Sequence, residues 1–411
     1  MNKIKLSSLL VVSLFLTGCI GILDRQVEEE IIVIEEVEDQ DQMIISPNLN
    51  TPENYYRTVL QEGDYRQSEA RGLVTQAINN RLDIKQLELG LMELASTKFP
   101  QSDYYFQEGQ YLEGSLINRW LRRYDENRQT HVEGLNPPLP EEDYTFLSEE
   151  TEILSSEERR LRVSHERQLH EEEPAYLSHI MEHNYLRDVG DGSIELGGLV
   201  LGISLNSVYS FQIVDERGLT HPFEVNLEDE IILEEGKKIA SEVLDRVRQR
   251  ENLANVPIVI ALYQEERRQA IIPGTFVAMT VVEPGRRIER WETVDDAHYF
   301  FPSSSATADH RDDATRFANF KQDIDGFFNN YIGIVGKGRY KNNQIQELTI
   351  DINLQSNGKA EIIAMTQYIT DRLKKHFPEN LTVQVYLTSL EGAESIIVRH
   401  ANEQPFVHIY R

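Results

Sequence analysis

The chain is 411 residues long and 40% hydrophobic, and it carries 69 Asp and Glu against 41 Lys and Arg, a formal net charge of −28. This length predicts two or three folded units, and the apolar content is sufficient for packed cores. A surface this acidic repels polyanions, so we expect no nucleic-acid partner. Beyond the N-terminus no apolar run approaches the length that crosses a bilayer, so we expect no further membrane span.

Residues 1–18 are predicted to form a lipoprotein signal peptide. Lys3 and Lys5 give a basic start, and the apolar run Leu6–Leu16 is too short to span a bilayer as a helix. The run ends in Leu16-Thr17-Gly18-Cys19, the pattern that lipoprotein signal peptidase recognises. Cys19 is also the only cysteine, so we expect it to carry a lipid on the extracellular face of the cell membrane. The expected partners are the membrane, signal peptidase and the lipoprotein-processing enzymes; the alternative is an ordinary secretory signal with an incidental cysteine.

Residues 19–50 are predicted to be an acidic tether, because a segment rich in like charges repels itself and extends. Residues 51–126 are predicted to form a helical N-terminal segment. Apolar residues spaced by three and four indicate helices over Ala70–Leu82, Asp83–Lys98 and Tyr111–Tyr124. Within the second of these, Asp83 followed by Gln86 predicts a capping box at the start of the helix.

Residues 127–190 are predicted to be a charged connector. The segment Asn136-Pro137-Pro138-Leu139-Pro140 interrupts regular structure, because proline lacks the N–H donor and disfavours helix in the residue before it. The charged run that follows has few apolar residues and predicts a solvated helix over Ser156–His170. A short helix is expected over Ala175–Leu186.

The C-terminal half contains an internal repeat, a β-α-β-β unit in residues 191–285 and again in 286–411. In each copy an alternating strand leads to a helix that Gly-Lys is predicted to open, at Gly236-Lys237 and at Gly358-Lys359. Two further strands follow each helix, and a longer insertion follows the first strand of copy one. The predicted fold class is α+β: a helical N-terminal segment followed by two repeated units with antiparallel strands and helices packed on the sheets.

Short motifs in a fixed order run along nearly the whole mature chain. They are Leu16-Thr17-Gly18-Cys19, Asn54-Tyr55-Tyr56-Arg57, Ala70-Arg71-Gly72, Phe106-Gln107-Glu108-Gly109-Gln110-Tyr111-Leu112, Gly134-Leu135-Asn136-Pro137-Pro138-Leu139, Leu196-Gly197-Gly198, Pro273-Gly274-Thr275-Phe276 and Gly333-Ile334-Val335-Gly336. Together they resemble the CamS sex pheromone lipoprotein family of Gram-positive bacteria. That resemblance implies that a hydrophobic peptide released from the signal sequence, here Val11–Gly18, acts as a mating pheromone for conjugative plasmids. It leaves the role of the mature part open, which we expect to be a non-enzymatic binding or interaction module for an extracytoplasmic ligand or protein.

One motif indicates an enzyme instead. His179-Ile180-Met181-Glu182-His183 has the H-x-x-E-H form of inverted zinc peptidases, in which two histidines one helical turn apart bind zinc and the glutamate activates water. The segment is short, and no third ligand stands out downstream. We therefore expect no catalytic residue, metal or cofactor, and we expect the histidines to lie on the solvent-exposed face of a helix. The alternative is a zinc-dependent hydrolase that uses His179, Glu182 and His183.

Overall fold

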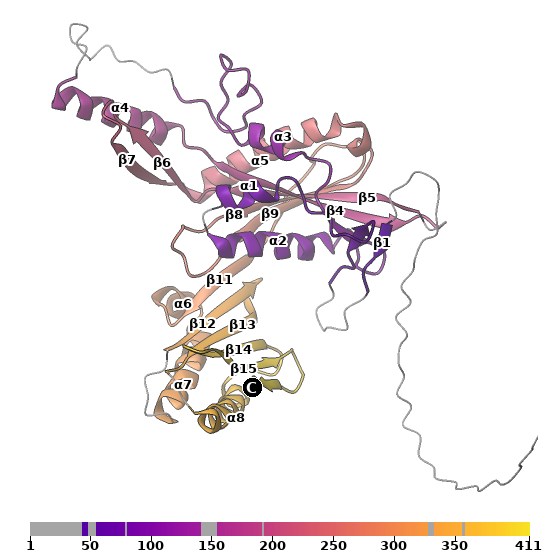
Figure 1. Cartoon of the computed structure of the whole chain (residues 1–411), viewed down its shortest axis with the longest axis vertical. Coiled ribbons are helices and arrows are strands. Elements are labelled where there is room, and N and C mark those ends of the chain that lie inside the picture. Colours follow the sequence, from indigo (N-terminus) through magenta and orange to yellow (C-terminus); the bar gives the residue numbers. More distant parts are fainter. Residues whose placement is uncertain are drawn as a thin grey trace, which may run out of the picture.

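The computed structural model describes residues 43–47, 55–78, 80–140, 154–190, 193–327, 333–355 and 358–411. The chain forms two units, each built on a six-stranded sheet, which follow one another along the long axis of the molecule (Figure 1). Cys19 and the predicted signal peptide lie outside the described residues. Within the described part of the chain, no helix is both long and apolar enough to cross a bilayer.

The first sheet consists of β3 (Tyr105–Glu108), β4 (Leu177–Asp188), β5 (Ile194–Leu205), β8 (Ile258–Gln264), β9 (Thr275–Val282) and β10 (Glu292–Thr293). Its spatial order is β10-β9-β8-β5-β4-β3. β5 and β8 are parallel, and the other neighbouring pairs are antiparallel. The central strands β5 and β8 are mostly apolar and almost wholly buried, as a sheet covered on both faces requires.

Helices cover both faces of the first sheet: α1 (Arg71–Ala77) and α2 (Arg81–Ala95) on one face, and α3 (Gly114–Trp120) and α5 (Asp229–Arg248) on the other (Figure 1). A single 3-10 turn, Glu251–Leu253, follows α5. Successive side chains of a strand point to opposite faces, so Val200 of β5 enters the core under α2 while Leu201 enters the core under α5. The first unit is therefore a three-layer arrangement.

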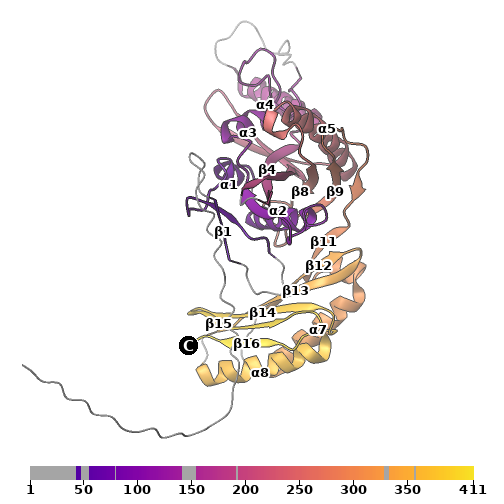
Figure 2. The same ribbon diagram turned by 90° about the vertical axis from the view of Figure 1, so that its right-hand side faces the viewer.

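The second sheet consists of β11 (Asp296–Phe301), β12 (Gly333–Lys341), β13 (Gln344–Asn353), β14 (Thr382–Ser389), β15 (Gly392–Arg399) and β16 (Phe406–Ile409), in that spatial order. Only β13 and β14 are parallel within it. One core holds this sheet against α6 (Ser304–Asp309), α7 (Arg311–Phe327) and α8 (Lys359–His376). No described helix of this unit covers the opposite face, which looks toward α2 (Figure 2).

Two smaller sheets complete the fold. β1 (Met43–Ile45) pairs with β2 (Val59–Gln61) beside the first unit. The hairpin of β6 (Val208–Val214) and β7 (Thr220–Asn226) projects from the first unit together with α4 (Ser156–Glu172) (Figure 1). The His170 ring of α4 stacks on Phe211 of β6 at 4.3 Å between centroids. The solvated helix predicted over 156–170 is thus α4.

The α+β class and the repeat are confirmed. Copy one is β5-α5-β8-β9, and copy two is β13-α8-β14-β15. The insertion predicted in copy one is the β6–β7 hairpin. Strands joined by short connections pair antiparallel, as predicted, whereas the two strands that flank α5 or α8 are parallel because a helical crossover returns the chain to the same edge of the sheet.

Several local predictions are wrong. Residues 175–186 contain β4 and no helix. α5 begins at Asp229, about two turns before Gly236. A Cβ at Gly236 would lie 2.5 Å from a methyl group of Leu205 and force it to move, so close packing, and not a helix start, accounts for the glycine there. α2 is capped by Asn80, whose side chain accepts a hydrogen bond from the N–H of Leu82, while Asp83 is fully buried.

Some predicted boundaries also fall within paired strands. β1 lies inside residues 19–50, which were expected to be tether throughout. β3 lies inside the segment expected to be helical, and β4 lies inside the expected connector, although both belong to the first sheet. The first sheet therefore includes strands that precede the repeat in the sequence.

Candidate functional site

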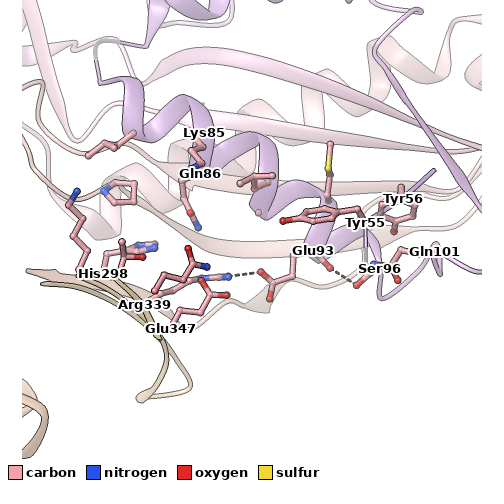
Figure 3. A pocket seen from close by; sticks show the side chains of 18 residues that line it. Tyr55, Tyr56, Lys85, Gln86, Glu93, Ser96, Gln101, His298, Arg339 and Glu347 are labelled. Carbon is pink, nitrogen blue, oxygen red and sulfur yellow. Dashed lines mark hydrogen bonds and ion pairs between the residues drawn. The ribbon is translucent and has the colours of Figure 1, made fainter. Parts of the chain in front are cut away.

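A groove of about 660 Å³ separates the two units at the open face of the second sheet (Figure 3). α2 forms one wall, and β12, β13 and β14 contribute the other. Tyr55, Tyr56 and Gln101 lie toward one end and His298 toward the other (Figure 3). The groove is thus built from three parts of the chain that are far apart in sequence.

Amphipathic patterns direct polar side chains into this groove. On α2, Leu87 and Leu91 face the first core, which leaves Gln86 and its polar neighbours on the outer side. On the second sheet, alternation sends Ile350 inward and Thr349 outward. Strand register then aligns Lys337, Thr349 and Gln384 as one row across three strands.

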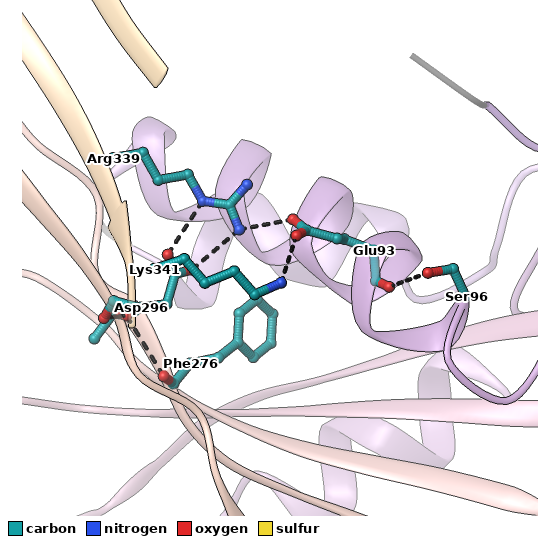
Figure 4. Close-up of polar contacts among 7 residues, drawn as sticks. Glu93, Ser96, Phe276, Asp296, Arg339 and Lys341 are labelled. Atoms are coloured by element: carbon teal, nitrogen blue, oxygen red, sulfur yellow. Dashed lines mark hydrogen bonds and ion pairs between the residues drawn. The ribbon is translucent and has the colours of Figure 1, made fainter. Parts of the chain in front are cut away.

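Glu93 of α2 holds the second unit against the first (Figure 4). Its carboxylate accepts from Nη2 of Arg339 at 2.7 Å and from Nζ of Lys341 at 2.8 Å. Arg339 also donates from Nε to buried Asp296 at 3.1 Å. Burial alone would disfavour the charged forms of Glu93 and Arg339. The positive charges of Arg339 and Lys341 outweigh burial at Glu93, so the pKa of Glu93 is lowered. The negative charges of Glu93 and Asp296 outweigh burial at Arg339, so the pKa of Arg339 is raised. Both groups are therefore ionised at neutral pH.

Several polar side chains of the groove have no hydrogen-bond partner among the described residues, in addition to the charged groups. The side chains of Gln86, Gln101 and Thr349 make no hydrogen bond to any described residue, and Lys85 forms no ion pair within that part of the chain. Burial lowers the pKa of His298 to about 4, so its ring is neutral at neutral pH. Amide, hydroxyl and imidazole groups, together with one ammonium group, are thus available to a polar ligand.

The H-x-x-E-H motif does not form a zinc site of the predicted kind. His179 and His183 lie on regularly paired β4, where four residues span about 13 Å, so the two rings cannot share one ion as they could on a helix. Glu182 points to the opposite face of the strand. Among the described residues, no group of three or more His, Cys, Asp or Glu side chains is placed to hold a metal. Both histidines are buried, which corrects the expected wet helix face.

Glu182 has a structural role instead. Its carboxylate accepts hydrogen bonds from the backbone N–H groups of Gln110, Tyr111 and Leu112, at 3.1, 3.0 and 2.7 Å. Burial raises the pKa of Glu182, and these three donors act in the opposite direction. The motif glutamate thereby fixes the turn that leads from β3 to α3.

The family assignment comes from the sequence as a whole. Residues 65–405 match the family described as "CamS sex pheromone cAM373 precursor". The chain belongs to the CamS family. No curated protein matches the chain.

Two solved structures resemble this CamS protein over most of its length. A sex pheromone precursor from Lactobacillus salivarius subsp. salivarius UCC118 is 28% identical, with a TM-score of 0.73 and coverage of 88% of this chain and 98% of that one. The C-terminal domain of the sex pheromone staph-cAM373 precursor from Staphylococcus aureus is 26% identical, with a TM-score of 0.63 and coverage of 82% and 98%. The family expected from the short motifs is confirmed, and so is the α+β class expected from the pattern of helices and strands.

Sequence reasoning missed the groove of this CamS protein. None of Gln86, Thr349 and Gln384 was assigned a binding role. Gln86 was predicted only as part of a capping box, and the other two occupy ordinary polar positions of strands. The one available signal was the polar face of α2 together with the polar alternation of β13, but nothing in the sequence says that these two faces meet. Cys19, the only site residue that was predicted outright, lies outside the described residues.

Proposed function

We propose that this CamS-family protein is a membrane-anchored extracytoplasmic lipoprotein whose mature part is a non-enzymatic binding module. Its signal peptide would be the source of a hydrophobic pheromone peptide, Val11–Gly18. Family membership and the two similar pheromone precursors support the pheromone role. The lone cysteine at the end of a signal-like segment supports the lipid anchor.

The groove between the units carries the proposal for the mature part, and a short peptide fits it best. Its volume of about 660 Å³ lies in the range of about 300–1,000 Å³ that is usual for ligand pockets. A peptide bond presents one N–H and one C=O group, and the amides of Gln86 and Gln101 can accept the first and donate to the second. The ammonium group of Lys85 can pair with a free C-terminal carboxylate.

Substitutions in the groove test peptide binding. A library of free hexapeptides is incubated with the purified protein, and retained peptides are identified by mass spectrometry and titrated by calorimetry. Gln86→Trp fills the groove with an indole ring, so we expect affinity to fall at least about tenfold, which corresponds to about 1.4 kcal/mol. Gln168→Trp, an exposed glutamine on α4 outside the groove, is the matched control and should bind normally.

The Lys85 contact has its own signature. Lys85→Gln should weaken the free-acid peptide but leave its C-terminally amidated form unchanged, because only the free acid carries the carboxylate. Retention of no peptide, or equal binding by the Gln86→Trp and Gln168→Trp variants, would refute a peptide site in the groove.

The anchor is tested separately. Cys19→Ala removes the thiol that would be lipidated, so we expect loss of acylation, loss of cleavage at that site and an unprocessed precursor. Membrane fractionation followed by mass spectrometry of the N-terminus measures all three. Ser13→Ala, within the apolar run, should be processed normally. If Cys19→Ala still yields a cleaved, acylated membrane protein, Cys19 is not the lipid site.

A further inference from the structure

A second cavity, of about 190 Å³, lies in the first unit among α1, α2, β3 and β4. Val74, Ile84 and Met181 give it an apolar wall. His179 and His183 line it from β4, on one side of a regularly paired stretch of strand. It is separate from the groove between the units, since the two have no lining residue in common.

The two histidines are buried with unused hydrogen-bonding groups. Neither ring nitrogen of His179 has a hydrogen-bond partner among the described residues, and the same holds for Nδ1 of His183. Both side chains are almost completely inaccessible to solvent. Burial lowers the pKa of His179 to about 4 and that of His183 to about 3, so both rings are neutral at neutral pH. Neutral imidazole has one donor and one acceptor nitrogen, and buried polar groups without partners are uncommon in folded proteins.

Carboxylates give this cavity a negative charge. Glu108 already has three donors in the protein, because it accepts from Tyr65 Oη at 2.6 Å, from Arg71 Nη1 at 2.6 Å and from the Ser68 N–H at 2.8 Å. Glu88 of α2 also lines the cavity, and its carboxylate makes no hydrogen bond to any described residue. Burial raises the pKa of Glu88, and the positive charge of nearby Arg71 only partly offsets this effect. The lining contains three carboxyl groups, those of Glu88, Glu108 and Glu182, against the one guanidinium group of Arg71, so the cavity favours a cation over an anion.

We propose that this cavity binds a small aliphatic primary ammonium compound. The ammonium group would donate to the carboxylate of Glu88 and to the acceptor nitrogen of one imidazole. The alkyl chain would lie along the apolar wall formed by Val74, Ile84 and Met181. A metal ion is a poorer fit, because β4 separates the two histidines by about 13 Å.

Pentylammonium is the probe. Titration into the full chain, followed by calorimetry and by ¹⁵N spectra of the histidine rings, should show one binding site and shifts at His179 or His183. The exposed ring of His408, in the other unit, should not shift. Pentanoate, which has the same chain length and the opposite charge, should not bind.

Substitution identifies the carboxylate. Glu88→Gln keeps the shape of the side chain and removes its charge, so we expect affinity for pentylammonium to fall about tenfold or more, the usual effect of losing one charge-assisted hydrogen bond. Glu126→Gln, at an exposed position outside the cavity, should bind as the parent does. The histidine spectra are recorded on the parent protein, so this test remains valid even if a variant fails to fold.

The proposal is overturned if neither buried histidine ring responds to pentylammonium at concentrations up to about 20 mM. It is also overturned if pentanoate binds equally well, or if a folded Glu88→Gln variant retains the parent affinity. Each of these results would mean that the cavity holds only solvent or selects ligands by size alone.

Discussion

Glu265 is a carboxyl group buried just after β8, close to a second buried carboxyl, Asp83. Glu265 accepts a hydrogen bond from the Ser204 hydroxyl at 2.7 Å. Asp83 accepts from Tyr263 Oη at 2.8 Å and from the Gly274 N–H at 2.6 Å. Burial raises the pKa of Glu265 to about 8 and that of Asp83 to about 6. Both groups are thus held closer to their protonated form in the folded chain than in the unfolded chain.

The raised pKa of Glu265 predicts a pH-dependent stability. A carboxyl with a folded pKa above its unfolded value stabilises the fold fully below the unfolded pKa, and that contribution is lost as pH rises through the folded pKa. Between about pH 6 and pH 8 the parent should therefore lose on the order of 2 kcal/mol relative to Glu265→Gln, which keeps its shape and has no charge to titrate. Urea midpoints at the two pH values measure the difference.

Comparison with the variant separates this effect from other titrations. The lowered pKa values of the buried histidines change stability in the opposite direction, but they are common to both proteins. Glu283→Gln, an exposed carboxyl paired with Lys98, is the matched control and should follow the parent at both pH values. Parallel pH profiles for the parent and Glu265→Gln would contradict the assignment.

At the scale of elements, β4 shows where reading the sequence failed. It lies between two covered faces, and all of its residues from Leu177 to Leu186 except Met181 are buried. A strand buried on both sides has no polar alternation, so periodicity cannot distinguish it from a helix. His179 and Glu182 made it look still less like a buried strand, because each is a polar group placed in the interior. β4 is a strand because it pairs with β3 and β5, and a local pattern in the sequence of β4 does not show that pairing.

The two repeat helices show which helical features could be predicted. The sequence of α5 and of α8 places apolar residues at helical spacing on one face, and Val243 and Ile369 on those faces are both fully buried. The helix starts were less certain because glycine has two uses. Gly358 is the N-cap of α8, whereas Gly236 lies inside α5 and allows Leu205 to approach. Local sequence patterns therefore predict the apolar face of a helix more reliably than they predict the structural role of a glycine.

At the scale of the whole molecule, the two units are joined by a short link and by the Glu93 contacts. Only Val294 and Asp295 separate β10 of the first sheet from β11 of the second. Glu93 and Arg339 are 246 positions apart, and no local pattern relates them. The groove was therefore beyond sequence reasoning even though the secondary structure on both of its sides was largely predicted.

The Glu93 contacts are expected to set the orientation of the units and hence the width of the groove. Glu93→Ala removes the partners of Arg339 and Lys341 across the interface, while Asp296 still holds Arg339. These side chains are partly exposed, so solvent screening limits the loss of stability to about 1 kcal/mol, too little to unfold either unit.

Spin labels at one exposed residue of α5 and one of α8 measure the orientation of the units. In Glu93→Ala they should give a broader distance distribution than in the parent. About 1 M salt should broaden the parent in the same direction, because it screens partly exposed ion pairs. Glu283→Ala, which breaks the exposed pair with Lys98 within the first unit, should leave the distribution unchanged. An equally narrow distribution in Glu93→Ala would show that the short link and β11 alone fix the two units.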